Sequence, residues 1–352
     1  ENRRNYAPID PLTAPAVSII VPAYNEEVNI VRTISNLKEQ DYPSLKIYLV
    51  DDGSKDNTLQ RVREVFENDD KVVIISKKNG GKASALNYGI AACSTDYIVC
   101  VDADTQLYKD AVSKLMKHFI SDKTGKLGAV AGNVKVGNQR NMLTYWQAIE
   151  YTTSQNFDRM AYSNINAITV IPGAIGAFRK DVLEAVGGFT TDTLAEDCDL
   201  TMSINEHGYL IENENYAVAM TEAPESLRQF IKQRIRWCFG VMQTFWKHRA
   251  SLFAPSKGGF GMWAMPNMLI FQYIIPTFSP IADVLMLFGL FSGNASQIFI
   301  YYLIFLLVDA SVSIMAYIFE HESLWVLLWI IPQRFFYRWI MYYVLFKSYL
   351  KA

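Results

Sequence analysis

Asp102 and Asp104 have the clearest chemical potential in this sequence, because they directly follow a short apolar run, 97–101. In an extended strand, residues i and i+2 lie on the same face, so the two carboxylates are expected side by side. Hard divalent cations such as Mg²⁺ or Mn²⁺ prefer such oxygen ligands and usually keep a bound diphosphate as a further ligand. The pattern predicts a Mg²⁺ or Mn²⁺ site at Asp102 and Asp104, with a solvated turn as the alternative.

A second acidic pair, Asp51 and Asp52, also ends an apolar run. The loop 22–26, which contains Tyr24 and Glu26, follows the first apolar run of the chain. We expect Asp51 and this loop to hold the ribose and base of a nucleotide. Two acids that cap turns are the alternative explanation.

Glu196 and Asp197 lie at the predicted start of a helix, where acidic residues commonly complement the helix dipole. A carboxylate held near a metal site can also remove the proton from an attacking hydroxyl group. Both interpretations of this pair remain open at the level of the sequence.

The segment Gln233–Trp237 combines polar, basic and aromatic residues. Arg234 and Arg236 are able to neutralise a departing diphosphate, and Trp237 offers a flat apolar face for a sugar ring. An Arg/Trp cluster at a membrane interface is the alternative.

The first hundred residues alternate buried-strand runs with helical periodicity, which predicts a parallel, doubly wound α/β sheet. Binding sites in such sheets form at the carboxyl ends of the strands, where the acidic pairs lie. Strands are predicted at 17–21, 46–50, 72–75 and 97–101, and helices at 28–37, 57–66 and 82–92.

The middle of the chain predicts a mixture of strands and helices. We expect strands at 130–136 and 168–178, a helix at 142–160 and another from about 194. A basic, aromatic helix at 225–249 has the composition of a helix in the plane of a membrane interface, although packing on the soluble domain is the alternative.

Charged residues are unevenly distributed. From Lys257 onward only nine of 96 residues are charged, against 59 of the first 256, which indicates a polar first part and a membrane-embedded second part. Segments 298–319 and 324–346 are long enough to span a membrane, and 262–291 has the length and prolines of a broken or re-entrant helix. Asp309, Arg334 and Arg338 lie within these segments. They are candidates for lining an exit path for the product, and helix–helix pairing or snorkelling to the membrane interface is the alternative.

Several features exclude other classes of protein. The net charge of −2 argues against nucleic acid as a partner. The sequence has no P-loop, no G-x-S-x-G elbow and no G-x-G-x-x-G after the first strand. No signal peptide opens the chain, and we expect it to be a segment of a longer protein.

In chain order, the motifs together resemble the family 2 processive glycosyltransferases, which include cellulose, chitin, hyaluronan and poly-N-acetylglucosamine synthases. The matching segments are 22–27, 50–54, 102–104, 195–197 and 233–237. Segments 172–179 and 222–234 are most similar to bacterial poly-β-1,6-N-acetylglucosamine synthases. The resemblance implies an α/β GT-A domain with a Rossmann-like mixed sheet at 1–224, an amphipathic interfacial helix at 225–257 and a transmembrane region at 258–352.

The resemblance also implies a role for each matching residue. Asp104 becomes the metal ligand, with Asp102 contacting both metal and UDP, and Asp197 becomes the base. The remaining matches, which contact the nucleotide, the diphosphate or the terminal sugar, are Tyr24, Glu26, Asp51, Asp52, Lys82, Glu196, Gln233, Arg234, Arg236 and Trp237. Ala195 departs from the family, which often has Thr at this position.

The activity implied is processive, inverting polymerisation of UDP-N-acetylglucosamine into a β-linked exopolysaccharide. Expected partners are the UDP-sugar, the growing polysaccharide and the lipid bilayer, with room for a small membrane partner subunit. The expected location is the cell membrane, crossed several times, with a cytosolic catalytic domain. The alternatives are a hyaluronan, chitin or cellulose type of synthase, single sugar transfer to a polyisoprenyl phosphate, and a catalytically silent receptor.

Overall fold

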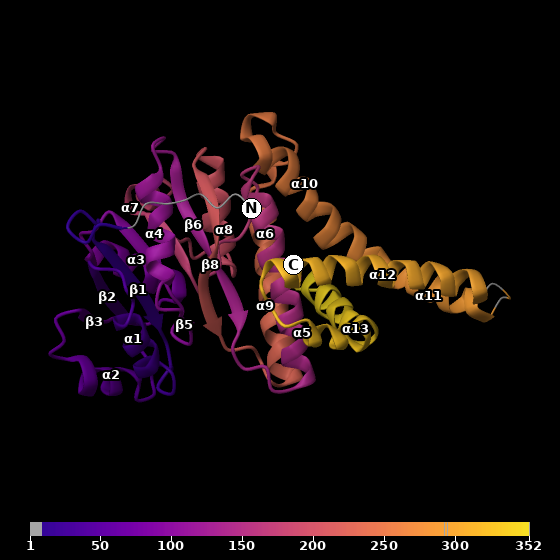
Figure 1. Ribbon diagram of the computed structural model, residues 1–352, viewed down its shortest axis with the longest axis horizontal. Coiled ribbons are helices and arrows are strands. Elements are labelled where there is room, and N and C mark those ends of the chain that lie inside the picture. Colours follow the sequence, from indigo (N-terminus) through magenta and orange to yellow (C-terminus); the bar gives the residue numbers. More distant parts are fainter. Residues whose placement is uncertain (1–8, 292, 294, 352) are drawn as a thin grey trace.

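A computed structural model describes residues 9–291, 293 and 295–351, which form an α/β domain and a helical extension (Figure 1). The strands are β1 (Val17–Ala23), β2 (Leu45–Asp51), β3 (Val72–Ser76), β4 (Tyr97–Cys100), β5 (Gln106–Leu107), β6 (Leu127–Val136), β7 (Gly176–Arg179) and β8 (Leu210–Thr221). The helices of the α/β domain are α1 (Ile30–Lys38), α2 (Thr58–Phe66), α3 (Lys82–Ala92), α4 (Ala111–Ser121), α5 (Met142–Glu150), η1 (Tyr151–Asn156), α6 (Phe157–Ser163), α7 (Lys180–Ala185), α8 (Glu196–Glu206) and α9 (Leu227–Lys247).

The strands form one mixed sheet in the order β3-β2-β1-β4-β7-β6-β8-β5. The four strands β3, β2, β1 and β4 pair in parallel, so the topology predicted for the first hundred residues is confirmed. β7 is antiparallel to both of its neighbours, β4 and β6, which places a reversed strand in the middle of the sheet. The carboxyl ends of the parallel strands therefore open beside the loop that leads into β7.

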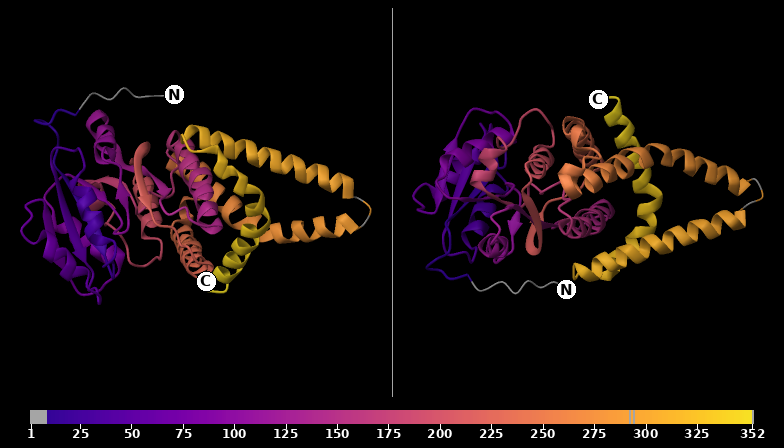
Figure 2. Two further views of the ribbon diagram at one scale, coloured as in Figure 1. Left: turned by 60° about the horizontal axis from the view of Figure 1, so that its bottom comes forward. Right: turned by 90° about the horizontal axis from the view of Figure 1, so that it is seen from above.

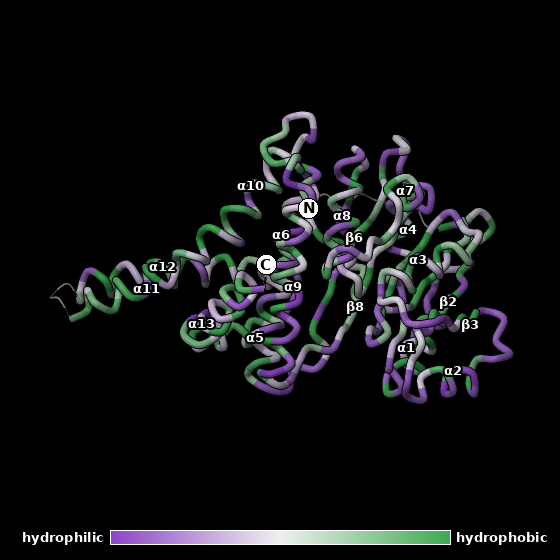
Figure 3. The backbone as a smooth tube through the Cα atoms, turned by 180° about the vertical axis from the view of Figure 1, so that it is seen from behind, coloured by the Kyte–Doolittle hydropathy of each residue, from purple (hydrophilic) through white to green (hydrophobic). Residues whose placement is uncertain are grey.

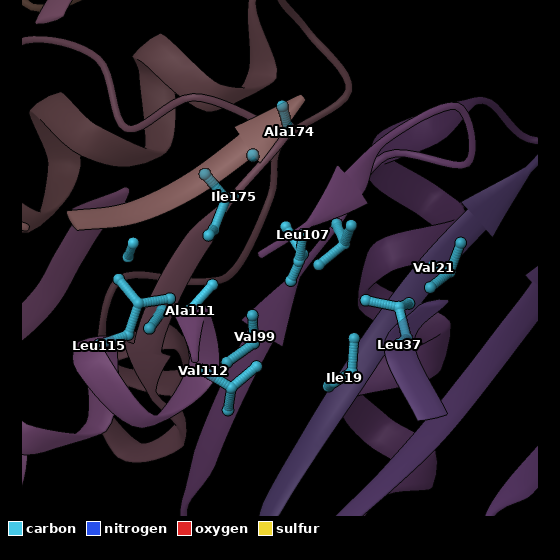
Figure 4. Close-up of a cluster of buried hydrophobic side chains, with 14 of the residues drawn as sticks. Ile19, Val21, Leu37, Val99, Leu107, Ala111, Val112, Leu115, Ala174 and Ile175 are labelled. Carbon is cyan, nitrogen blue, oxygen red and sulfur yellow. The ribbon is translucent and has the colours of Figure 1, made fainter. Parts of the chain in front are cut away.

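Apolar side chains from strands and helices fill the space beside this sheet (Figure 4). Ile30, Ile34 and Leu37 recur at helical spacing on α1 and are fully buried against the core that contains Ile19 and Val99. Burying one such side chain stabilises a fold by about 1.5–3 kcal/mol relative to exposing it. The amphipathic pattern of α1 thus fixes its inner face.

The prediction of a strand at 168–178 is wrong for most of these residues. Only Gly176–Arg179 pairs in the sheet, as β7. Pro172 has no amide hydrogen for a ladder, and its carbonyl instead accepts a turn hydrogen bond from the Ile175 amide at 3.1 Å. The Ile171 amide donates to the Thr201 hydroxyl at 2.9 Å, so side-chain contacts replace the missing ladder. This irregular segment becomes a wall of the site described below.

The C-terminal extension consists mainly of a long helical hairpin (Figure 2). Its elements are η2 (Arg249–Ser251), η3 (Pro255–Lys257), η4 (Phe260–Ala264), α10 (Met265–Asn267), η5 (Met268–Ile274), α11 (Ile275–Phe291), α12 (Ala295–Phe319), η6 (Leu324–Trp329) and α13 (Ile330–Tyr349). Two helical runs, Phe260–Phe291 and Ala295–Phe319, are long and apolar enough to cross a membrane, and Figure 3 shows hydrophobic residues along both. These two runs are the arms of the hairpin.

The first arm differs from the broken or re-entrant helix that its prolines predict. Residues 260–291 form one continuous helical run of 32 residues. Two π-helical stretches, η4 and η5, interrupt the regular α-helical hydrogen bonding before Pro276 and Pro280. Such turns are one way in which a helix accommodates local disruption without ending.

The segment 324–346, expected as a further span, is not among the membrane-spanning candidates in the described part of the chain. It begins as a 3₁₀-helix, and α13 then crosses the hairpin between its two arms (Figure 2). Arg334 forms a bidentate ion pair with Asp309 of α12, and Arg338 Nη2 lies 3.0 Å from Asp283 Oδ1 of α11. Helix–helix pairing, the alternative considered for these charges, is therefore confirmed.

The end of the second arm is attached directly to the sheet. Asn133 Nδ2 in β6 donates to Glu320 Oε2 at 2.5 Å, and Glu320 is 6 % exposed. Lys135 Nζ, also in β6, lies 2.6 Å from Glu322 Oε1. These contacts, termed the β6 joint, connect the hairpin to the α/β domain.

Candidate active site

The loop after β1 is held against the loop after β2, at the carboxyl ends of two parallel strands. The Asn25 amide donates to Ser54 Oγ at 3.0 Å, and the Glu26 amide donates to Thr58 Oγ1 at 2.8 Å. Asn25 has a φ of 57°, which asparagine tolerates better than most residues and which turns the chain sharply here. Tyr24, on this loop, is 42 % exposed, so its ring is accessible to a ligand.

Asp51 and Asp52 are both buried but have different surroundings. Asp51 accepts hydrogen bonds from the Ser54 amide at 3.3 Å and from Ser76 Oγ at 3.2 Å. Asp52 accepts from Lys77 Nζ at 2.5 Å and from the amides of Gly80 and Gly81. The Asp52 carboxylate thus fixes the turn that starts α3.

Lys82, the first residue of α3, lies between two of the predicted acids. Its Nζ is 2.6 Å from Asp102 Oδ1 and 3.3 Å from Glu196 Oε1. Burial alone would lower the pKa of Lys82, but the carboxylates of Asp102, Glu196 and Asp197 raise it above its ordinary value. The ammonium form is therefore favoured, and it joins α3, the end of β4 and α8.

Glu26 and Asp104 carry carboxylates that are hard to ionise in the protein alone. Burial, followed by the charge of Asp104, raises the pKa of Glu26 to about 7. Burial, followed by the charge of Asp102, raises the pKa of Asp104 to about 6. A cation between these groups would relieve their mutual repulsion.

The donor set at this place fits a hard divalent cation that shares its coordination with a ligand. Within residues 9–291, 293 and 295–351, no three His, Cys, Asp or Glu side chains are close enough together to hold a metal ion by themselves. Asp102 and Asp104 offer carboxylate oxygens, and a bound diphosphate would supply further oxygen atoms. The pair is therefore suited to bind a metal together with a phosphorylated substrate.

Asp197 lies in the first turn of α8, where its Oδ1 accepts from the Cys198 amide at 2.8 Å. Burial and the neighbouring charge of Glu196 raise the pKa of Asp197, although Lys82 partly opposes this effect. A carboxylate with a raised pKa is a better proton acceptor than an ordinary aspartate. Its position and environment suit a general base.

The α8 helix is packed closely against α9. A Cβ atom on Gly240 of α9 would lie 2.7 Å from the backbone nitrogen of Ala195, so only glycine permits this approach. Further along, His248 Nε2 lies 3.0 Å from Asp199 Oδ1, and His248 Nδ1 lies 2.8 Å from Glu206 Oε2. The turn that carries Asp197 is thereby fixed relative to α9.

The predicted motif on α9 presents its side chains in different directions. Arg236 is exposed, whereas Arg234 is only 4 % exposed and donates through Nη2 to Glu150 Oε2 at 2.7 Å. The guanidinium carbon of Arg234 lies 4.5 Å from the centre of the Trp237 ring. Arg234 is therefore already paired within the protein.

One cavity of about 700 Å³, termed the site cavity, brings most of the predicted residues together. It is lined by Lys82, Asp102, Asp104, Glu196, Asp197, Gln233, Arg234, Arg236 and Trp237. The lining also includes Phe271 and Gln272 of the first hairpin arm, together with Arg338 and Tyr342 of α13. The cavity thus extends from the acidic strand end to the helices of the C-terminal extension.

Four predicted residues do not line the site cavity. Tyr24, Glu26, Asp51 and Asp52 belong to the strand-end loops on the β1–β2 side of the sheet. The electrostatic influence of Asp104 on Glu26 indicates that these loops nevertheless adjoin the acidic pair. The structure therefore separates a strand-end region from the cavity proper.

Sequence reasoning missed several residues of the cavity wall. Glu150, Ser154, Gln155 and Arg159 belong to a helix that contains the π-helical stretch η1. The signal in the sequence is the uninterrupted polar run 152–156 within the helical segment. Arg159 is 7 % exposed and donates to Asn156 Oδ1 at 2.5 Å, which makes it a buried charge at the cavity wall.

Residues 18–187 match the family described as Glycosyl transferase family 2. The chain is 34% identical over 224 residues to the poly-beta-1,6-N-acetyl-D-glucosamine synthase of Staphylococcus aureus, covering 64% of this chain and 54% of that protein. The Staphylococcus epidermidis protein of the same name is 34% identical over 234 residues, covering 65% of this chain and 56% of that protein. The chain therefore spans about half the length of the curated relatives it matches.

Among solved structures, a mannosyltransferase from Pyrobaculum calidifontis, determined in complex with GDP-Man and Mn²⁺, has the same fold. The TM-score is 0.65 at 24% sequence identity, and the match covers 94% of this chain and 90% of that one. This likeness, together with the mixed sheet, confirms the predicted GT-A fold class.

Proposed function

We propose that the protein is an inverting glycosyltransferase that extends a polysaccharide at a membrane, because residues 18–187 match the family described as Glycosyl transferase family 2. The observation that carries the proposal is that Asp102, Asp104, Asp197 and Trp237 all line one cavity. Metal-binding acids, a base and an aromatic platform are the groups that direct sugar transfer requires.

In this proposal, Asp102 and Asp104 hold Mg²⁺ or Mn²⁺, which would neutralise negative charge on the diphosphate of the donor. Arg236, exposed and lining the cavity, adds positive charge near the leaving group. Asp197 accepts the proton of the attacking hydroxyl, and the ring of Trp237 holds the sugar that carries this hydroxyl. Displacement in one step inverts the anomeric centre without a covalent intermediate.

The strand-end loops are the proposed nucleotide site. Asp51 and the accessible ring of Tyr24 are suited to contact a ribose and a base, and Glu26 lies near the metal-binding pair. Lys82 would contact the diphosphate, with Glu196 and Asp102 as its counter-charges. The contacts of Asp52 favour a supporting role, because its carboxylate already holds the Gly80–Gly81 turn.

We further propose UDP-N-acetylglucosamine as the donor and a poly-β-1,6-linked product, supported by the name of the staphylococcal relatives. Membrane placement is supported by the two long apolar helices, and a path for the product by the extension of the site cavity to these helices. The catalytic domain would then face the cytosol.

The test is synthesis by the purified full chain in detergent, with labelled UDP-N-acetylglucosamine, UDP-glucose or UDP-glucuronic acid and Mg²⁺ or Mn²⁺. We expect a high-molecular-mass product from UDP-N-acetylglucosamine that a β-1,6-specific glucosaminidase digests. If the only product is a single sugar on a lipid phosphate, the proposal of processive synthesis is wrong and the protein transfers one sugar at a time. Failure to bind UDP or to transfer any sugar would refute the proposal.

The matched pair of variants is Asp197→Asn and Asp181→Asn. Asp181 lies on α7, its side chain is 62 % exposed, and it pairs with Arg179 outside the site cavity. Asp197→Asn should lower the rate of transfer about 10²- to 10⁴-fold while UDP binding remains, whereas Asp181→Asn should behave like the unmodified protein.

A further inference from the structure

Three residues from distant parts of the chain meet beside the acceptor end of the site cavity. Arg234 Nη2 of α9 donates to Glu150 Oε2, the last residue of α5, at 2.7 Å. The hydroxyl of Tyr337, on α13, donates to the same carboxylate oxygen. These residues, Glu150, Arg234 and Tyr337, are termed the Glu150 triad.

Two members of the triad are shielded from water, whereas the side chain of Glu150 is 19 % exposed at the wall of the site cavity. Arg234 is 4 % exposed and Tyr337 is 7 % exposed. Removing one partner of a buried, hydrogen-bonded charge leaves the other uncompensated, which is much more costly than at the surface. For this reason the contact with Glu150 holds the guanidinium group of Arg234 in one place.

The guanidinium group of Arg234 is also stacked on the proposed acceptor platform. Its central carbon lies 4.5 Å from the centre of the Trp237 ring and 5.0 Å from that of Phe230. A planar guanidinium at this distance attracts the face of an indole ring and restricts its tilt. Glu150 therefore fixes the guanidinium group of Arg234, and this group in turn restrains the ring of Trp237, which lines the cavity.

The third member of the triad connects this arrangement to the C-terminal extension. Tyr337 packs with Trp146 and Phe230 in one buried cluster. Trp146 Nε1 donates to the Trp329 carbonyl at 3.0 Å, and Gln333 Nε2 donates to the Trp146 carbonyl at 3.0 Å. Figure 1 shows α13 beside α5 and α9, so docking of α13 and ordering of the triad occur at one interface.

We propose that Glu150 and Tyr337 are positioning residues for the acceptor: through Arg234 they fix the ring of Trp237, so that the acceptor site is complete only when α13 is docked. This inference rests on the proposed function, because it assigns the Trp237 face to the acceptor sugar. According to this inference, acceptor binding depends partly on α13, the helix that crosses the helical hairpin. This helix lies outside residues 18–187, the segment that matches the family.

The main test is the Tyr337→Phe variant of the full chain, which removes one hydroxyl and keeps the packing of the ring. With labelled UDP-N-acetylglucosamine and a short oligosaccharide acceptor, we expect the KM for the acceptor to rise about tenfold, as for the loss of one hydrogen bond to a charged group. The KM for the donor and the dissociation constant of UDP should stay unchanged. Tyr343→Phe, on the same helix but 52 % exposed, is the matched control and should not alter either constant.

A double variant separates positioning from general destabilisation. If Tyr337 acts through the indole ring, Tyr337→Phe should have almost no further effect on acceptor KM in a Trp237→Phe background. Full additivity of the two changes, or an equal loss of donor and acceptor affinity, would overturn the inference. Glu150→Gln provides a second probe at the centre of the triad, with melting temperature as the check on folding.

The outcomes distinguish this inference from the proposed function. If the unmodified protein transfers no sugar from any donor, the proposed function fails. If it transfers sugar and Tyr337→Phe has the acceptor KM of the unmodified protein, the positioning role alone fails.

Discussion

Gly240→Ala tests whether the close contact between α8 and α9 is needed for transfer. The added Cβ would lie 2.7 Å from the Ala195 nitrogen and 2.8 Å from the carbonyl carbon of Leu194. Both are backbone atoms, so no side-chain rotation can relieve the clash. Ordinary contact begins at 3.4 Å, and the helices must therefore separate by 0.7 Å at this point.

The expected loss is larger for catalysis than for stability. Overpacking typically costs about 1–3 kcal/mol, and replacing glycine by alanine inside a helix returns about 1 kcal/mol. The melting temperature should therefore fall by only a few degrees. Because a misplacement of about 1 Å in a reacting geometry costs about 10²-fold in rate, we expect kcat to fall about 10- to 100-fold.

The assay is the initial rate of sugar transfer at saturating donor and acceptor, with thermal unfolding recorded on the same preparations. Gly137→Ala is the control, because its Cβ would meet no atom closer than 3.5 Å. A folded Gly240→Ala protein with unchanged kcat would refute the argument that this helix contact sets the position of Asp197.

Three further predictions concern charge and proton transfer. Asp197→Asn should lower kcat about 10²- to 10⁴-fold, the usual contribution of a general base; because burial and Glu196 raise its pKa, activity of the unmodified protein should fall on acidification at a higher pH than an ordinary aspartate would give. Burial alone would lower the pKa of His248, but its hydrogen bonds to Asp199 and Glu206 raise it to about 9. The stabilisation that protonated His248 provides is therefore complete below its ordinary pKa of 6.5 and is lost as the pH rises through about 9. In the His248→Gln variant, the melting temperature should accordingly depend less on pH across that interval. Asp104→Asn should weaken binding of the donor with Mn²⁺ or Mg²⁺, yet it should raise the melting temperature without ligands, because it removes a carboxylate whose pKa burial and Asp102 raise to about 6.

Local patterns in the sequence predict the acidic strand ends well. The runs before Asp51 and Asp102 form parallel neighbours of β1, so their carboxyl ends meet as expected. The run 168–178 fails as a strand because Pro172 cannot join a ladder, and β8 is not predicted because its first half, 210–216, mixes charged and polar residues. The periodicity of apolar residues identifies single elements, and it does not show whether 168–178 or 210–216 pairs with other strands.

Contacts between distant segments are beyond such reasoning. Glu150 and Arg234 are 84 residues apart, and Tyr337 is 187 residues from Glu150. Their meeting depends on how α5, α9 and α13 pack together, which no local spacing encodes. For the same reason, the sequence does not reveal that Arg234 pairs with Glu150 and stacks on Trp237, while the contact of Arg234 with a diphosphate stays a prediction.

The β6 joint has a consequence for building hybrid enzymes. Glu320 and Glu322 follow the second hairpin arm, but their partners Asn133 and Lys135 lie in the sheet. A chimera that exchanged only the C-terminal helices would bring foreign residues to 320 and 322, and Asn133 and Lys135 would lose the two carboxylates and keep only backbone carbonyls as acceptors. Transplanting the helical hairpin of this protein therefore requires that four side chains, two from each half, be moved as one unit.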